Sequence, residues 1–120
     1  MNKSMITTAF ELPGYVITEN LGLARGITVR TTSIVGGFAG FIQSLFGGNI
    51  HAYTRVCEQA RDEAFQQMRR HAQSMGANAI IGLRYDASEF SGQTEVLCYG
   101  TAVVANQLHD DEKNDRVRHD

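Results

Sequence analysis

The chain has 120 residues, of which 42% are hydrophobic, and this size and composition predict a single ordinary domain with its own core. Its formal net charge is −2 and it carries no stripe of Lys and Arg, which argues against broad, phosphate-driven binding of nucleic acid. Trp is absent and aromatic residues make up 8% of the chain, so the core should be mostly aliphatic.

Short β-strands are predicted in the N-terminal part of the chain. Alternating and β-branched residues favour strands at residues 5–9, 15–19 and 27–31. Pro13-Gly14 indicates a turn between the first two strands. Before the third strand, the two glycines of Gly22-Leu-Ala-Arg-Gly26 are typical of a bulge or a sharp bend.

A stripe of large apolar residues follows, between two Gly-Gly pairs. It consists of Phe38, Phe41, Ile42, Leu45 and Phe46, at positions i, i+3, i+4, i+7 and i+8. This spacing predicts a short helix over about residues 38–46. Core packing or burial in an oligomer is the first interpretation of the stripe. The second is a membrane-surface or partner-docking helix, in which case an unknown protein partner would bind through Phe38–Phe46.

The uncharged stretch that contains these residues, 31–54, does not resemble a membrane span. A span needs about 20 predominantly apolar residues, whereas Gly36-Gly37, Gly47-Gly48 and several polar side chains interrupt this stretch. The first residues of the chain lead into Thr-rich sequence rather than the apolar region of a signal peptide. We therefore expect a cytoplasmic protein without a membrane span.

The clearest predicted element is an amphipathic helix from Tyr53 to Met75, roughly 35 Å long. Small and apolar side chains recur on one side of it, and charged or polar side chains occupy the other. The apolar side consists of Tyr53, Cys57, Ala60, Ala64, Met68, His71, Ala72 and Met75. Gly76 lies just past the end of this helix and is predicted to terminate it in the left-handed conformation.

Two further strands are predicted at residues 78–85 and 94–105, joined by a polar turn at 87–93. Gly100 within the last strand indicates a bulge or a close approach of another backbone. From Asn106 onward the residues are polar or charged, so we expect a domain over residues 1–105 and a disordered tail over 106–120.

The predicted order is therefore β-β, short helix, long helix, β-β. This order predicts an α+β fold in which one long helix packs on a small, mainly antiparallel sheet. A single helix leaves much of such a sheet uncovered. We expect the uncovered face, or the Gly-rich apolar segment, to be buried by self-association.

Four residues are candidate ligands of a soft metal, namely Cys57, Cys98, His51 and His71. Thiolates and imidazoles are the ligands that zinc and copper(I) prefer, but no CxxC and no zinc-type spacing joins these four residues. Both cysteines lie in apolar surroundings that are typical of buried core thiols. A structural role is the favoured interpretation, and a ligand set shared across subunit interfaces is the alternative.

Four charged residues form a candidate interface or anion-binding patch, namely Arg61, Arg84, Asp86 and Glu89. Arg61 falls within the apolar side of the long helix, and a buried Arg needs a partner such as Asp86 or Glu89. Arg84 and Asp86 should share one face of their strand, with Leu83 and Tyr85 on the other. A salt bridge within or between subunits is favoured over anion binding.

No catalytic motif occurs in the chain. Gly-x-Ser-x-Gly, Walker-type and His-Glu-x-x-His patterns are all missing, and neither Gly-Gly pair is followed by the Lys-Ser/Thr of a phosphate-binding loop. We therefore predict a protein that is not an enzyme. An enzyme with an interface site built from Arg61, Arg84, Asp86 and Glu89 is a further hypothesis.

Four blocks of the sequence carry a family resemblance, over residues 5–105. They are Gly22-Leu-Ala-Arg-Gly26 with the strand after it, the Phe/Gly stretch that ends in Gly47-Gly48 before Tyr53, the helical Ala60-Arg-Asp-Glu-Ala64, and Gly76-Ala-Asn-Ala-Ile-Ile-Gly82 with Leu-Arg-Tyr-Asp86. In these blocks the chain resembles the YbjQ-like family of small bacterial proteins, which bears a heavy-metal-binding label.

The resemblance implies a dodecin-like β-α-β-β subunit that assembles into a ring of five copies, and it implies no established activity. We therefore predict an uncharacterised homo-oligomeric binding or assembly module without a cofactor. A heavy-metal-binding protein that uses Cys57, Cys98, His51 and His71 for zinc, copper or another soft metal is the alternative.

Overall fold

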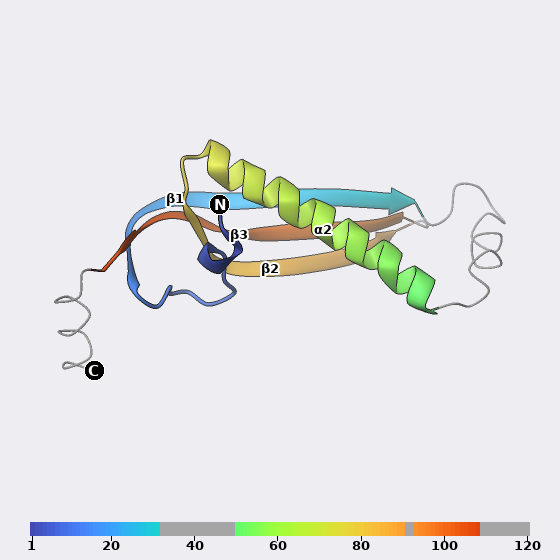
Figure 1. Ribbon diagram of the computed structural model, residues 1–120. Coiled ribbons are helices and arrows are strands. Elements are labelled where there is room, and N and C mark those ends of the chain that lie inside the picture. Colours follow the sequence, from blue (N-terminus) through green and yellow to red (C-terminus); the bar gives the residue numbers. More distant parts are fainter. Residues whose placement is uncertain (32–49, 91–92, 109–120) are drawn as a thin grey trace.

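The computed structural model describes residues 1–31, 50–90 and 93–108. In chain order, its elements are the 3-10 helix η1 (Lys3–Met5), β1 (Tyr15–Thr31), α2 (Ile50–Ser74), β2 (Ala79–Phe90) and β3 (Gln93–Gln107). The three strands form one antiparallel sheet in the order β1-β3-β2, and α2 crosses one face of it diagonally (Figure 1). The predicted α+β architecture, with one long helix on a small antiparallel sheet, is confirmed.

The N-terminal half differs from the sequence prediction in its strands. The two strands expected at residues 15–19 and 27–31 are one strand of 17 residues. Its register against β3 shifts between Ile17 and Glu19 and between Asn20 and Gly22. These bulges bend β1 without ending it, which is why the glycine signals did not separate two strands. Residues 5–9 form no strand, and their one bridge joins Ile6 to Ile80.

The boundaries of other elements also differ between the sequence prediction and the structure. The short helix predicted at residues 38–46 lies outside the described residues. β2 continues to Phe90, so part of the turn expected at residues 87–93 belongs to a strand instead. Beyond β3, Leu108 is buried and its backbone N–H donates to the carbonyl of Gly14 at 2.9 Å. No helix among the described residues is long and apolar enough to cross a membrane.

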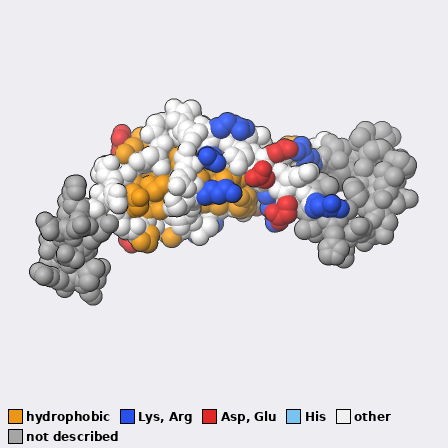
Figure 2. Space-filling model, in the orientation of Figure 1, with side chains coloured by type: hydrophobic (Ala, Val, Ile, Leu, Met, Phe, Trp, Pro, Cys, Tyr) orange, Lys and Arg blue, Asp and Glu red, His pale blue; other side chains and the backbone are white. Residues whose placement is uncertain are grey.

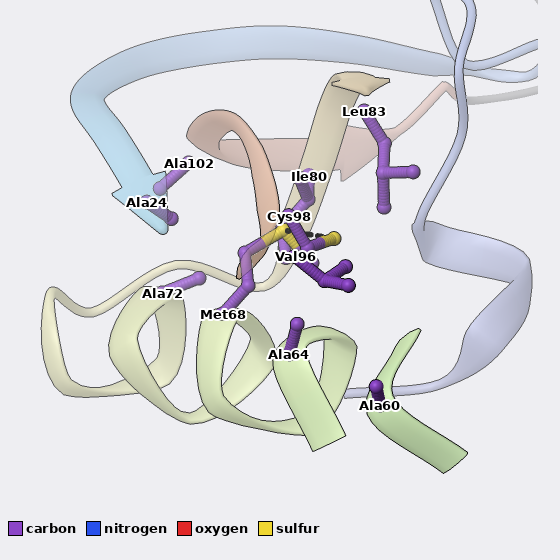
Figure 3. Close-up of a cluster of buried hydrophobic side chains, with 10 residues drawn as sticks. All are labelled: Ala24, Ala60, Ala64, Met68, Ala72, Ile80, Leu83, Val96, Cys98 and Ala102. Atoms are coloured by element: carbon purple, nitrogen blue, oxygen red, sulfur yellow. Dashed lines mark hydrogen bonds between the residues drawn. The ribbon is translucent and has the colours of Figure 1, made fainter. Parts of the chain in front are cut away.

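The core between α2 and the sheet consists mainly of small side chains. Ala60, Ala64, Met68 and Ala72 lie four residues apart on one side of α2 and are all buried (Figure 3). The sheet residues that face them are Ala24, Ile80, Leu83, Val96, Cys98 and Ala102. Arg30 of β1 also forms an ion pair with Glu63 of α2. The burial of these four residues confirms the centre of the predicted apolar side, whereas His71 is exposed and the side chain of Tyr53 lies outside the described residues.

Gly26 determines how closely α2 approaches β1. A Cβ atom at this position would collide with the carbonyl oxygen of Ala64 and would lie 2.5 Å from the backbone nitrogen of Met68. The helix backbone therefore rests directly on the strand backbone at this point. Only glycine permits this contact, which the sequence signal of a bulge or bend at Gly26 did not anticipate.

Among the described residues, the second face of the sheet has a smaller core at one end. Leu12, Ala79, Val103 and Ala105 are buried together there, with Met5 and Tyr15 packed against them. This cluster anchors the segment between η1 and β1. Three backbone hydrogen bonds join the same segment to the outer edge of β2, between residues 7–9 and residues 80–83.

The end of α2 follows the predicted capping. Gly76 has a φ of 93°, its N–H bonds to the carbonyl of Gln73, and the N–H of Ala77 bonds to the carbonyl of Ala72. This pair of bonds is the Schellman motif with glycine at C′. Asn78 then pins the end of β3. Its side-chain amide donates to the carbonyl of Ala105 and accepts from the N–H of the same residue, at 2.8 Å each.

The contact at Gly26 yields a stability prediction. Gly26→Ala should lower the free energy of unfolding by about 3 kcal/mol or more, because a methyl group must displace the backbone of α2. Gly76→Ala is the matched control. No atom lies within 4 Å of a Cβ at Gly76, so that variant should lose only the left-handed backbone cost of about 1–2 kcal/mol. Urea unfolding of both variants measures the difference, and an equal loss would contradict the proposed contact.

Candidate functional site

An open groove of about 550 Å³ lies between the N-terminal segment, α2 and β2. Its floor is apolar and its rim carries charges of both signs. Ile6, Phe65, Leu83 and Tyr85 form the apolar part, and Lys3, Thr7, Thr8, Glu58, Arg61 and Asp62 form the polar part. Figure 2 shows apolar side chains beside the N-terminal segment, with acidic and basic side chains along the neighbouring part of α2. The volume of the groove falls within the usual range for small-ligand sites.

The helix supplies the charged wall of this groove from one stripe. Glu58, Arg61, Asp62 and Phe65 stand at i, i+3, i+4 and i+7, so they point to one side of α2. The Arg61 guanidinium lies 3.4 Å from a Glu58 carboxylate oxygen, and both side chains are more than half exposed. An exposed pair of this kind contributes little to stability.

The expectation that Arg61 is buried is therefore wrong. The buried line of α2 runs through Ala60, Ala64 and Met68, and Arg61 is turned by about 100° from Ala60. Its charged partner among the described residues is Glu58 rather than Asp86. Asp86 lies on the opposite face of the sheet, and the side chain of Glu89 is outside the described residues.

Arg84 and Asp86 share one face of β2, as predicted. They stand opposite Tyr99 and Leu97 of β3, while Tyr85 stands opposite Cys98 on the helix-covered face. Arg84 is already engaged within its own chain. Its Nη1 donates to the carbonyls of Thr8 at 2.9 Å and Leu83 at 2.7 Å, and its Cζ lies 5.5 Å from the centre of the Phe10 ring. Arg84 thus holds the N-terminal segment against β2.

A bulge in β2 explains why this clamp fits. Two residues, Gly82 and Leu83, stand opposite the single residue Gly100. Gly82 has a φ of 63°, and a Cβ on it would lie 2.9 Å from Phe10. At Gly100, a Cβ would lie 2.7 Å from Ile80, so the close approach indicated by the sequence is confirmed. The extra residue turns Leu83 toward the helix-covered core.

The candidate metal ligands are far apart in one chain. Cys57 and His71 are fourteen residues apart on α2, which corresponds to roughly 21 Å. Cys98 is fully buried beside Met68, whose Sδ lies 3.7 Å from its Sγ, and Met68 is itself roughly 16 Å along the helix from Cys57. His71 Nδ1 accepts a hydrogen bond from the N–H of Arg25 at 3.1 Å.

His51 is the second residue of α2, but its side chain lies outside the described residues. Among the described residues, no three His, Cys, Asp or Glu side chains gather into a metal-sized cluster. The geometry therefore does not bring Cys57, Cys98 and His71 together as one set of ligands within one subunit.

Burial controls the chemistry of Cys98 and its neighbour. Desolvation raises the pKa of the Cys98 thiol to about 11. Desolvation also raises the pKa of Tyr85 to about 12, with Cys98 as the next cause. Both groups are therefore protonated at neutral pH, and a protonated thiol is a poor nucleophile and a poor metal ligand.

This burial predicts different reactivities for the two cysteines, both of which are free thiols. With an alkylating reagent at neutral pH, the half-buried Cys57 should react first, and Cys98 should react only after the chain unfolds. Peptide mass spectrometry of the native protein and of Cys57→Ser measures this order. Rapid labelling of Cys98 in native Cys57→Ser would show that this thiol is accessible.

Comparison with known proteins places this fold in a family. A family model described as "Putative heavy-metal-binding" matches residues 4–106. A UPF0145 protein of Chromobacterium violaceum is 60% identical over 111 residues, covering 92% of this chain and 95% of the relative. A UPF0145 protein of Burkholderia thailandensis is 63% identical over 102 residues, covering 84% of this chain and 92% of the relative.

A solved structure shares the fold. It is a protein of unknown function of the DUF74 family from Pediococcus pentosaceus, with a TM-score of 0.56 and 22% sequence identity. The alignment covers 88% of this chain and all of the other. Because the family model and the bacterial relatives span nearly the whole described fold, the chain belongs to the YbjQ family, also named UPF0145.

Proposed function

We propose that this chain is the subunit of a homo-oligomer and acts as a binding or assembly module rather than as an enzyme. The observation that carries the proposal is the distribution of side-chain sizes on β1, where small residues face α2 and large apolar residues face away from it. On the face that α2 covers, the residues are Ala24, Gly26 and Thr28. On the opposite face stand Arg25 and three large apolar residues, with Leu23 58% exposed, Ile27 47% and Val29 51%.

An antiparallel sheet with one solvated face normally alternates apolar residues inward and polar residues outward. Between Leu23 and Val29 of β1, the large apolar side chains point outward instead. Across the sheet, Leu23, Arg25 and Ile27 stand opposite Thr101, Tyr99 and Leu97 of β3. The three β3 residues are themselves only partly buried. Together these side chains make a band that a second protein surface would cover.

Charged side chains lie within and beside this band on the same face. Arg25 and Arg84 flank Tyr99 in one cross-strand row, and Asp86 and Glu95 lie in the next two rows. Tyr and Arg are both enriched in protein interfaces. Both signs occur within a few residues, so one copy offers charges that complement another. A second copy of this chain is the occupant that we propose.

A closed ring of five copies, the form that the family resemblance implies, is the assembly that we propose for these subunits. The two free thiols support a cytoplasmic location as part of the same proposal, since cytosolic proteins keep their cysteines reduced. A soft-metal function would require ligands from several copies, because the described thiols and His71 do not converge within one. The groove beside the N-terminal segment is available for the binding role.

The proposal predicts a change of mass when the outer face of β1 is altered. By light scattering, the wild-type protein should have a mass several times the 13.2 kDa of one chain. Ile27→Glu should reduce this to the mass of one chain, because a carboxylate would be buried at the interface. Ile27→Val is the control and should keep the wild-type mass. A wild-type protein that is monomeric at all concentrations would refute the proposal.

A further inference from the structure

The outer edge of β1 is closed over part of its length by side chains of α2. The backbone N–H of Arg25 donates to His71 Nδ1 at 3.1 Å, and that of Ile27 donates to Gln67 Oε1 at 3.2 Å. Each bond occupies a donor that a neighbouring strand would otherwise use. Backbone groups alternate along a strand, so the N–H groups of Val29 and Thr31 also point outward. Neither has an acceptor among the described residues.

The outer edge of β2 is closed at the same end of the sheet, by the chain's own N-terminal segment. Thr7 donates to Ile80 at 2.9 Å, Gly82 to Ala9 at 2.8 Å, and Leu83 to Thr7 at 3.1 Å. The segment continues no further along the edge, because residues 10–14 turn away toward β1.

The direction of the remaining backbone groups of β2 follows from the sheet register. The N–H of Arg25 points away from its opposite residue, Tyr99. Tyr99 therefore directs its own backbone groups to the other side, toward Arg84 of β2. By alternation, the N–H and C=O groups of Tyr85 and Ala87 point outward. Within the part of the chain that the structure describes, no backbone group pairs with them.

The free parts of the two edges thus lie at the same end of the sheet. Val29 of β1, Glu95 of β3 and Ser88 of β2 stand in one cross-strand row. Both edges are closed at the end that contains Ala24 and Ile80, and within residues 1–31, 50–90 and 93–108 nothing pairs with either edge near this row. The two edge strands also run parallel to each other, because each is antiparallel to β3.

We infer that copies of this chain join edge to edge, with β2 at Tyr85–Ala87 pairing in parallel with β1 at Val29–Thr31 of the next copy. This inference rests on the proposed homo-oligomer and specifies its contact. The contact is heterologous, since two different edges meet, and a repeated heterologous contact generates a ring when its rotation closes. Closure would leave no exposed sheet edge. It would also bring the apolar bands of all copies to the same side of the joined sheet.

Proline substitutions test this pairing, because proline removes one N–H and is tolerated on a strand edge where that N–H faces solvent. Ala87→Pro blocks the β2 side of every contact and Val29→Pro blocks the β1 side. Each variant alone should therefore have the mass of one chain, 13.2 kDa, by light scattering. Ala87→Ser and Val29→Thr keep the N–H and should keep the wild-type mass. Circular dichroism verifies that the variants fold.

Mixing the two proline variants gives a sharper result. The intact β2 edge of Val29→Pro can pair with the intact β1 edge of Ala87→Pro, but no further copy can add. An equimolar mixture should therefore form a dimer of twice 13.2 kDa and nothing larger. If only Ala87→Pro dissociates and Val29→Pro alone keeps the wild-type mass, the contact joins two β2 edges and the inference is wrong.

The remaining outcomes separate this inference from the proposed function. If both proline variants keep the wild-type mass while Ile27→Glu dissociates, the edge pairing is refuted and the homo-oligomer stands. If the wild-type protein is monomeric, both fail. Hydrogen exchange of the wild-type assembly covers the case in which a proline variant does not fold. The amides of Tyr85 and Ala87 should be protected, and rapid exchange at both would refute the pairing.

Discussion

The contact between the backbones of α2 and β1 at Gly26 is the constraint on which the rest of the fold depends. Because no side chain separates the helix from the strand, the residues around the contact must also be small, and Ala24, Ala60 and Ala64 meet this need. A helix this close brings Gln67 and His71 within reach of the edge of β1, where they accept two of its backbone hydrogen bonds. One glycine thus positions the helix and closes part of a sheet edge.

The same close contact places the large apolar side chains of this part of β1 on the face of the sheet that α2 does not cover. From Ala24 to Thr28, β1 presents only alanine, glycine and one buried threonine to the helix, and Leu23, Ile27 and Val29 stand on the uncovered side. The subunit therefore buries only part of the apolar surface that its sequence contains.

Periodic features of the sequence predicted much of this fold. The spacing of Ala60, Ala64, Met68 and Ala72 gave the buried side of α2, and the single residue Gly76 gave its end, because both depend only on local geometry.

Features that depend on residues distant in the chain could not be predicted in this way. The two-for-one bulge at Gly82 and Leu83 is defined by its partner Gly100, and the turn of Arg61 away from the core is set by where the helix meets Gly26. Arg61, a candidate site residue in the sequence, lines the groove, but no local pattern indicated that the N-terminal segment would form one of its walls.

The bond pair of Asn78 has a further chemical consequence. Its amide serves as donor and acceptor at once to Ala105, so slow hydrolysis to a carboxylate would set an oxygen against a carbonyl oxygen and loosen the end of β3. The fold thus carries a site at which ageing of the polypeptide, rather than any ligand, would weaken the sheet.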